Sequence, residues 1–224
     1  MSEDDAEQTP ADMRADMRAV VLADPADVNR LRELADQARW TLFEDLPRGC
    51  RRMHRLSWRT QDGGEVHYYE SHLSGSGVVL AGAPDPSTAE ELIDRVSARV
   101  PVRTEGDLLA RASTASEPAE LVSTVLALGV LRTGFFNAGN WRWAGADVRD
   151  PRYRELVERL AGHPNRHVRR ALMITVADWL SWWPELVEPV LARRAEETEL
   201  AELVEILAEF AANRTAESSY STYP

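Results

Sequence analysis

The 224-residue sequence contains no lysine, a single cysteine and no apolar run long enough to cross a membrane. All 26 basic residues are therefore arginine, whose planar cation makes bidentate hydrogen bonds. Cys50 has no second cysteine to pair with, which does not favour secretion. A membrane-spanning helix needs about 20 consecutive apolar residues. These absences predict a cytoplasmic protein with no membrane part.

Motifs that would name a reaction are also missing. The sequence has no Gly-Lys-Ser/Thr phosphate loop and no Gly-x-Ser-x-Gly nucleophile turn. His163 and His167 are four residues apart, but a metal site needs three or four converging ligands. We therefore predict a non-enzymatic protein with no cofactor and no metal. The net charge of −11 makes nucleic acid a poor partner unless a local basic face exists.

The first part of the chain predicts a small N-terminal module over residues 23–83. Residues 1–22 are expected to form an acidic, partly disordered leader that ends in a weak helix. Asp24 and Pro25 are typical of a helix start, and the apolar stripe after them extends to Leu42. From Arg52 the apolar period changes to two, which predicts three antiparallel strands in a meander.

From residue 84 onward the apolar period is that of helices. Pro86, Pro118, Pro151 and Pro184 are 32, 33 and 33 residues apart, which suggests an internal repeat or the chance spacing of twelve prolines. The apolar positions after Pro164 form the stripe of one long helix that ends before Pro184. We predict a helical domain over residues 84–213 and a disordered tail over 214–224.

Two short motifs carry a resemblance to a known family. Val168-Arg169-x-Ala171 after a proline-bearing turn, and Ala127-Leu128-Gly129 late in an earlier helix, resemble the compact bacterial form of the HEAT-like helical repeats. The resemblance covers residues 105–212. It implies a mainly α (α+β) fold, with a short HEAT-like helical stack after the helix-plus-meander module. Such stacks offer extended surfaces without built-in chemistry, so an adaptor that recognises a protein partner is implied.

The segment 133–145 is the first candidate for a binding surface. Three glycines break regular structure there, yet four large aromatic residues lie among them. Aromatic, arginine and asparagine side chains are common in protein interfaces, but the same aromatics would also suit a core cap where one helix is missing. The candidate contacts, in this loop and on the later long helix, are Phe135, Phe136, Asn140, Trp141, Arg142, Trp143, Arg166, Arg169 and Arg170.

A basic run lies in the predicted strands and has two interpretations. It comprises Arg48, Arg51, Arg52, Arg55 and Arg59. On a strand, Arg51, Arg55 and Arg59 share a face. That face would bind phosphate or an acidic partner, or it would pair with acidic residues of the same chain.

Two other functions remain open beside the adaptor. Asp178 next to Trp179, Trp182 and Trp183 resembles, in residue type only, the base-holding cleft of helical-repeat DNA glycosylases of the AlkD type. That function requires duplex DNA binding, which the acidic charge opposes. The alternative is an immunity or inhibitor protein that blocks a toxin-like partner with its acidic faces. The oligomeric state is not indicated by any pattern in the sequence.

Overall fold

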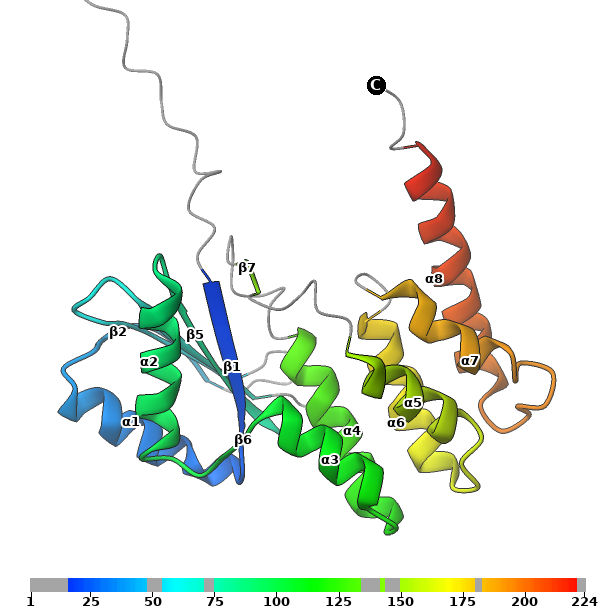
Figure 1. Cartoon of the computed structure of the whole chain (residues 1–224), viewed down its shortest axis with the longest axis horizontal. Helices are drawn as coiled ribbons and strands as arrows, with labels where there is room; N and C mark the ends of the chain where they lie inside the picture. The colour runs from blue at the N-terminus through cyan, green and yellow to red at the C-terminus, as the bar shows by residue number, and fades with distance from the viewer. Residues whose placement is uncertain are drawn as a thin grey trace, which may run out of the picture.

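The computed structural model describes residues 16–47, 54–70, 75–133, 142–143, 150–179 and 183–220. The architecture is α+β, with one large antiparallel sheet and helices on both of its faces (Figure 1). The strands are β1 (Asp16–Leu22), β2 (Thr41–Leu46), β3 (His54–Arg59), β4 (Glu65–Glu70), β5 (Gly77–Ala83), β6 (Val102–Arg103) and β7 (Arg142–Trp143).

The helices lie between the strands in the sequence or after them. The α-helices are α1 (Val28–Gln37), α2 (Pro86–Ser97), α3 (Glu105–Thr114), α4 (Pro118–Thr133), α5 (Pro151–Ala161), α6 (Arg166–Trp179), α7 (Glu188–Leu191) and α8 (Ala201–Tyr220). Two short 3-10 helices, η2 (Pro25–Asp27) and η4 (Pro184–Val187), precede α1 and α7. The prediction of helices from residue 84 onward is thus met by α2 to α8.

The sheet is larger than the predicted meander. Six strands run antiparallel to their neighbours in the order β2-β3-β4-β5-β1-β6, and β7 pairs in parallel with the start of β1. β3, β4 and β5 do follow one another as a meander, but β2 extends it on one side and β1 on the other. The prediction of a mainly α protein with a three-stranded meander is therefore wrong.

Residues 16–22 form a central strand and not the predicted weak helix. Val20 and Leu22 point to one face of the sheet, and Met17 and Val21 point to the other. Because helices cover both faces, both sets of side chains are buried. A strand of this kind has a continuous apolar run without alternation, which resembles a short buried helix in the sequence.

The helix that begins near Asp24 ends five residues earlier than its apolar stripe suggests. Arg39 has a φ of 55°, which is the left-handed conformation that ends many helices. The Trp40 amide donates to the Ala35 carbonyl at 2.9 Å, the long hydrogen bond of a Schellman cap. The chain therefore leaves α1 and enters β2, so Leu42 lies on a strand.

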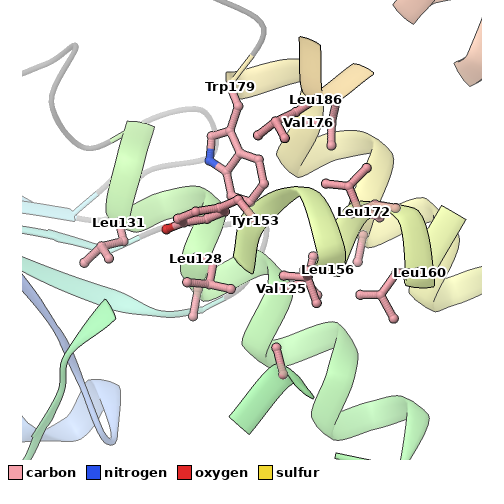
Figure 2. Packing of buried hydrophobic residues seen from close by; sticks show 14 of the residues in the cluster. Val125, Leu128, Leu131, Tyr153, Leu156, Leu160, Leu172, Val176, Trp179 and Leu186 are labelled. Atoms are coloured by element: carbon pink, nitrogen blue, oxygen red, sulfur yellow. The ribbon is translucent and has the colours of Figure 1, made fainter. Parts of the chain in front are cut away.

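Two apolar cores lie on the two faces of the sheet. One packs α1 and α2 against side chains such as Leu56, Trp58 and Val79. The other packs Met17, Val78 and neighbouring residues against α3 and α4, and it continues through α5, α6, α7 and α8. Figure 2 shows the helical part of this core around Tyr153 and Trp179. The sheet and the later helices thus share one continuous core, and the predicted domain boundaries stay a prediction.

The resemblance to HEAT-like repeats is wrong, because the helices after residue 84 do not stack as repeated pairs. α2 packs on β5 and β1, whereas α4 packs against α6 and β1. Pro86, Pro118, Pro151 and Pro184 each occupy the first position of a helix. Proline suits that position because its missing N–H would be unpaired there. Their regular spacing therefore marks helix starts and not repeat units.

Candidate functional site

The predicted aromatic loop lies largely outside the described residues. Phe135, Phe136, Asn140 and Trp141 are not among them. Arg142 and Trp143 form β7, where the register pairs them with Asp16 and Met17 of β1. The structure thus places the backbone of these two residues beside the start of a central strand, and their role in binding stays a prediction.

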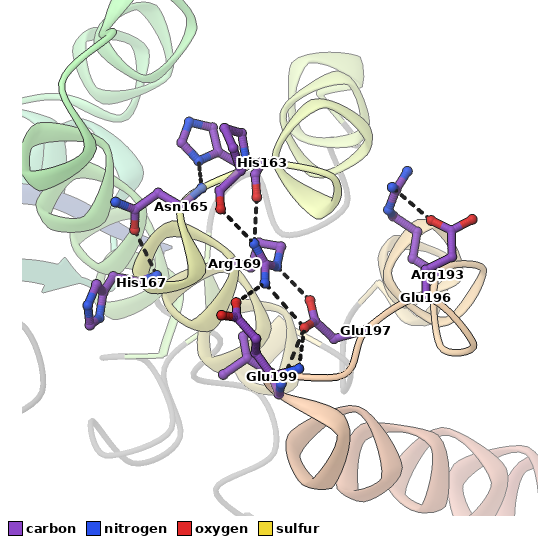
Figure 3. A network of polar contacts seen from close by, with 10 residues as sticks. His163, Asn165, His167, Arg169, Arg193, Glu196, Glu197 and Glu199 are labelled. Atoms are coloured by element: carbon purple, nitrogen blue, oxygen red, sulfur yellow. Dashed lines mark hydrogen bonds and ion pairs between the residues drawn. The ribbon is translucent and has the colours of Figure 1, made fainter.

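Arg169 is enclosed by acceptors of its own chain (Figure 3). Its guanidinium donates to Glu197 at 2.6 and 3.2 Å, to Glu199 at 2.7 Å, and to the carbonyls of His163 and Pro164 at 2.8 and 3.1 Å. Hydrogen bonds from Arg169 hold the pKa of the Glu197 carboxyl below its usual range. Arg169 therefore joins the start of α6 to the segment before α8.

The two neighbouring arginines of α6 differ from Arg169. Arg166 and Arg170 are both exposed. Of these three predicted binding residues, one is thus committed to internal carboxylates and two face solvent. Exposed arginines on a helix are ordinary surface residues, so they do not by themselves define a site.

The tryptophans near Asp178 lie in the core where the structure describes them. Trp179 is 1% exposed, and its ring meets the Tyr153 ring edge-on with centroids 4.8 Å apart (Figure 2). Trp183 packs on Tyr153 with centroids 5.0 Å apart. Trp182 lies outside the described residues. Because the Trp179 ring is covered by other aromatic rings, it offers no free face on which a nucleobase would stack.

The most prominent exposed apolar surface lies at the other side of the molecule, on the edge strand β2. In the described part of the chain, no strand pairs with its outer side. Its large apolar side chains stay exposed, with fractions of 44% for Leu42, 47% for Phe43 and 37% for Leu46. An open edge can pair with another chain, and natural proteins limit this with charged residues, proline, bulges or a covering segment. β2 carries Glu44, Asp45 and a register shift after Leu42, yet its large apolar side chains remain exposed. We call Thr41–Leu46 with these three side chains the open edge.

The opposite edge of the sheet differs from the open edge. There β1 is paired by β6 at Val21 and Leu22, and by β7 at Asp16 and Met17. Its apolar residues are buried. One edge of the sheet is therefore closed by short strands, and the other presents apolar side chains on a strand that no further described strand joins.

A polar network fixes the open edge to the rest of the sheet. Ser57 donates to Glu44 Oε2 at 2.9 Å, and Arg55 Nε lies 2.5 Å from the same oxygen. His67 Nδ1 lies 2.9 Å from Ser57 Oγ, and His67 Nε2 lies 3.3 Å from Glu65 Oε2. Burial lowers the pKa of His67, and the Glu65 carboxylate opposes that shift. Through Glu44, this network sets the position of β2 on β3.

Phe43 is held in its exposed position by side chains of β3 and β4 on the face of the sheet that carries this network. The register of β2 on β3 shifts between Leu42 and Glu44, which is a β-bulge at Phe43. The Arg59 guanidinium lies over the Phe43 ring at 5.2 Å from its centroid, and the His67 ring meets it edge-on at 6.1 Å. Bulges change the direction of side chains, and this one places the Phe43 ring against Arg59 and His67 while the ring stays exposed.

The basic run is partly neutralised within the sheet. Arg55 and Arg59 lie on one face of β3, as predicted, and pair with Glu44 at 2.5 Å and with Glu65 at 3.0 Å. Arg32 of α1 pairs with Asp45 at 3.3 Å on the other side of β2. Arg48, Arg51 and Arg52 lie outside the described residues. The carboxylates near the open edge are therefore balanced, which leaves its apolar side chains as its most prominent exposed feature.

The contact between Ser57 and His67 is not a nucleophile with its base. A catalytic serine gives its proton to the histidine, whereas the Ser57 hydroxyl donates its single proton to Glu44. Ser57 is also completely buried, so no substrate atom reaches its oxygen. Among the described residues, no group of three or more histidine, cysteine or acidic side chains is arranged to hold a metal ion. The network is thus structural.

The sequence contains a signal for the open edge that the apolar stripe concealed. Leu42, Phe43 and Leu46 are three large apolar residues within a stretch that also holds Glu44 and Asp45. On a helix that continued α1, positions 42, 43 and 46 would lie on one face, so the helical apolar period did not reveal the strand.

The described helices include none that is long and apolar enough to cross a membrane. Searches of protein-family models, curated proteins and solved structures gave no match to this chain.

Proposed function

We propose that this protein is a non-enzymatic binding module that recognises another protein by pairing a strand of that partner with the open edge. The observation that carries the proposal is the exposure of Leu42, Phe43 and Leu46 on an edge strand whose outer side pairs with no described strand. In strand addition, backbone hydrogen bonds supply affinity and alternate side chains supply specificity. We place this function in the cytoplasm, in keeping with the single cysteine.

The two faces of β2 define what the partner strand would contain. Leu42 lies opposite Trp58 and Asp45 opposite Leu56, on the α1 side of the sheet. Phe43 lies on the other face, in contact with Arg59 and His67. An added strand therefore meets apolar surface on both of its own faces. The partner segment is an extended peptide that carries apolar side chains on both of its faces, and therefore at neighbouring positions.

The rigid support of the open edge favours binding without rearrangement. Glu44 is fixed by Ser57 and Arg55, and Asp45 is held by Arg32. A preformed edge loses little conformational entropy when a partner strand pairs with it. By contrast, the buried Ser57 hydroxyl and the buried Trp179 ring offer no support for catalysis on an ester or on a nucleobase.

The proposal is tested with displayed peptides of about ten residues, long enough to form one strand. Peptides selected on the full chain are titrated against wild type and against Leu42→Lys/Leu46→Lys. Because lysine is a residue that blocks edge pairing, we expect binding to weaken by about tenfold or more. Gln37→Lys/Gln61→Lys is the matched control, because it adds the same charge at two exposed positions.

The mode of binding is read from the peptide backbone. Hydrogen bonds to one neighbouring strand come from alternate residues of the added strand. N-methylation at every second position should therefore abolish binding in one register and leave it intact in the other. Equal binding of all N-methylated peptides, or unchanged binding to the lysine variant, would overturn strand addition at the open edge.

A further inference from the structure

Helix α8 has a second exposed apolar surface, far from β2. Its inner side packs Val204 and Leu207, both fully buried, against α6, α7 and η4. Its outer side exposes Ile206 at 40% and Phe210 at 53%. These two residues are four apart, so their side chains lie next to each other on one face of the helix. α8 and β2 lie at opposite ends of the long axis in Figure 1.

The residues around this apolar pair are acidic. Glu202 and Glu209 are exposed, and no ion pair of either is found among the described residues. Glu205 pairs with Arg194 through a hydrogen bond of 2.6 Å. Over residues 201–220 the sequence has Glu202, Glu205, Glu209 and Glu217 against the single Arg214. The exposed face is therefore an apolar pair between two uncompensated carboxylates.

A second copy of the same helix does not fit this face. Two α8 helices packed in either direction would bring several glutamates together against one arginine each, and like charges at close range are destabilising. The whole chain adds to this repulsion with its net charge of −11. The charge of the face is complementary instead to a segment that carries arginine or lysine beside apolar side chains.

We propose that α8 is a docking surface for a basic amphipathic helix of another protein. Two apolar residues of that helix cover Ile206 and Phe210, and its cations lie near Glu202 and Glu209. Recognition by an amphipathic helix uses anchors three or four residues apart, which is the spacing of Ile206 and Phe210. This surface is independent of the open edge, so the two proposals fail separately.

The test uses a synthetic basic amphipathic peptide of about 20 residues, with leucine on one face and lysine on the other. Its binding to the full chain is followed by fluorescence anisotropy. Ile206→Ser/Phe210→Ser should weaken binding by about tenfold. Glu202→Gln/Glu209→Gln keeps the shape of the face and should weaken it by about fivefold, with a loss of salt dependence.

Three controls separate this surface from general attraction to an acidic protein. Glu90→Gln/Glu91→Gln removes the same charge from exposed positions of α2 and should leave binding unchanged. Leu42→Lys/Leu46→Lys changes the open edge and should also have no effect. A peptide with glutamate in place of lysine should not bind.

Other outcomes would overturn the proposal. Equal losses in the Glu90/Glu91 and Glu202/Glu209 variants would mean non-specific charge attraction. Unchanged binding to Ile206→Ser/Phe210→Ser would place the peptide elsewhere. Sedimentation that shows a dimer of the wild type, lost in the Ile206/Phe210 variant, would make a second copy the occupant.

Discussion

Gly129 of α4 lies directly against Thr175 of α6. A Cβ atom at position 129 would come within 2.8 Å of the Thr175 hydroxyl oxygen. That hydroxyl is buried and donates to the Val125 carbonyl at 3.2 Å. The absence of a side chain at 129 therefore lets α4 and α6 approach closely, so a close helix contact, and not a HEAT-like repeat, accounts for Gly129.

The first prediction tests this contact. Gly129→Ala should lower the free energy of unfolding by about 1–2 kcal/mol, because overpacking outweighs the gain in helix propensity of about 1 kcal/mol. In a Thr175→Ala background the nearest contact is removed, and the same change should be neutral or stabilising. Urea unfolding of the four proteins measures both effects. Equal effects of Gly129→Ala in the two backgrounds would contradict the close approach.

The second prediction concerns Arg169 and its exposed neighbour. The Arg169 side chain is 13% exposed and that of Glu197 is 7% exposed. Arg169→Ala should lower the free energy of unfolding by about 1–3 kcal/mol, a range between those of exposed and buried pairs, because Glu197 loses its main donor. Arg170→Ala, one residue along the same helix, should change it by less than about 0.5 kcal/mol. Similar losses in both variants would show that the enclosed contacts of Arg169 do not stabilise the fold.

The third prediction is a pH dependence from His67. Burial lowers the pKa of His67 below its ordinary value of 6.5. On acidification the unfolded chain therefore binds a proton before the folded chain does. The stability contributed by the neutral ring is complete above pH 6.5 and decreases as the pH falls toward the pKa of the folded state.

This dependence is measured by urea unfolding between about pH 7.5 and about pH 5.5. His67→Gln should flatten the decrease relative to wild type. His167→Gln, at an exposed position of α6, should keep the wild-type slope. A wild-type slope in the His67 variant would mean that other groups cause the acid sensitivity.

The fourth prediction concerns the start of α3. The Thr104 hydroxyl accepts from the Asp107 amide at 3.1 Å, and Asp107 accepts from the Thr104 amide at 2.9 Å, which together form a capping box. Hydrogen bonds from Thr104 lower the pKa of Asp107. Thr104→Ala should lower the free energy of unfolding by about 1 kcal/mol, and Ser113→Ala in the last turn should have little effect. Thermal unfolding that ranks the two variants equally would argue against the cap.

The helices with a clear apolar stripe were predictable from the sequence. In α5, the residues Tyr153, Leu156, Val157 and Leu160 are all buried, as their 3.6-residue period indicates. The two-residue period from Arg52 also predicted the strands β3 and β4, and Gly63, which has a φ of 78°, lies in the turn between them. Local periodicity was sufficient for α5 because its buried residues lie on one face. It was sufficient for β3 because apolar and polar side chains alternate along it, although Ser57 is buried on the second face.

The remaining sheet and the open edge were not predictable in this way. β1 is buried on both faces, so Val20, Val21 and Leu22 show no alternation. In β2 the bulge at Phe43 breaks the two-residue period, and the left-handed Arg39 that separates it from α1 is not a glycine. Long-range pairing decides both strands, and no local pattern reports it. The spacing of the prolines did not distinguish a repeat from a series of helix starts, because proline is common at the first position of any helix.

The position of β1 in the sheet has a consequence for the order in which the chain folds during synthesis. β1 is made first, yet its neighbours are β5 and β6, which are made only at residues 77–83 and 102–103. The hairpins of β3, β4 and β5 can form as they leave the ribosome, because their partners are consecutive. The apolar run Val20-Val21-Leu22 must wait for these later strands. β1 therefore stays unpaired until β5 has been made, and its exposed apolar run is the part of the nascent sheet most prone to aggregation.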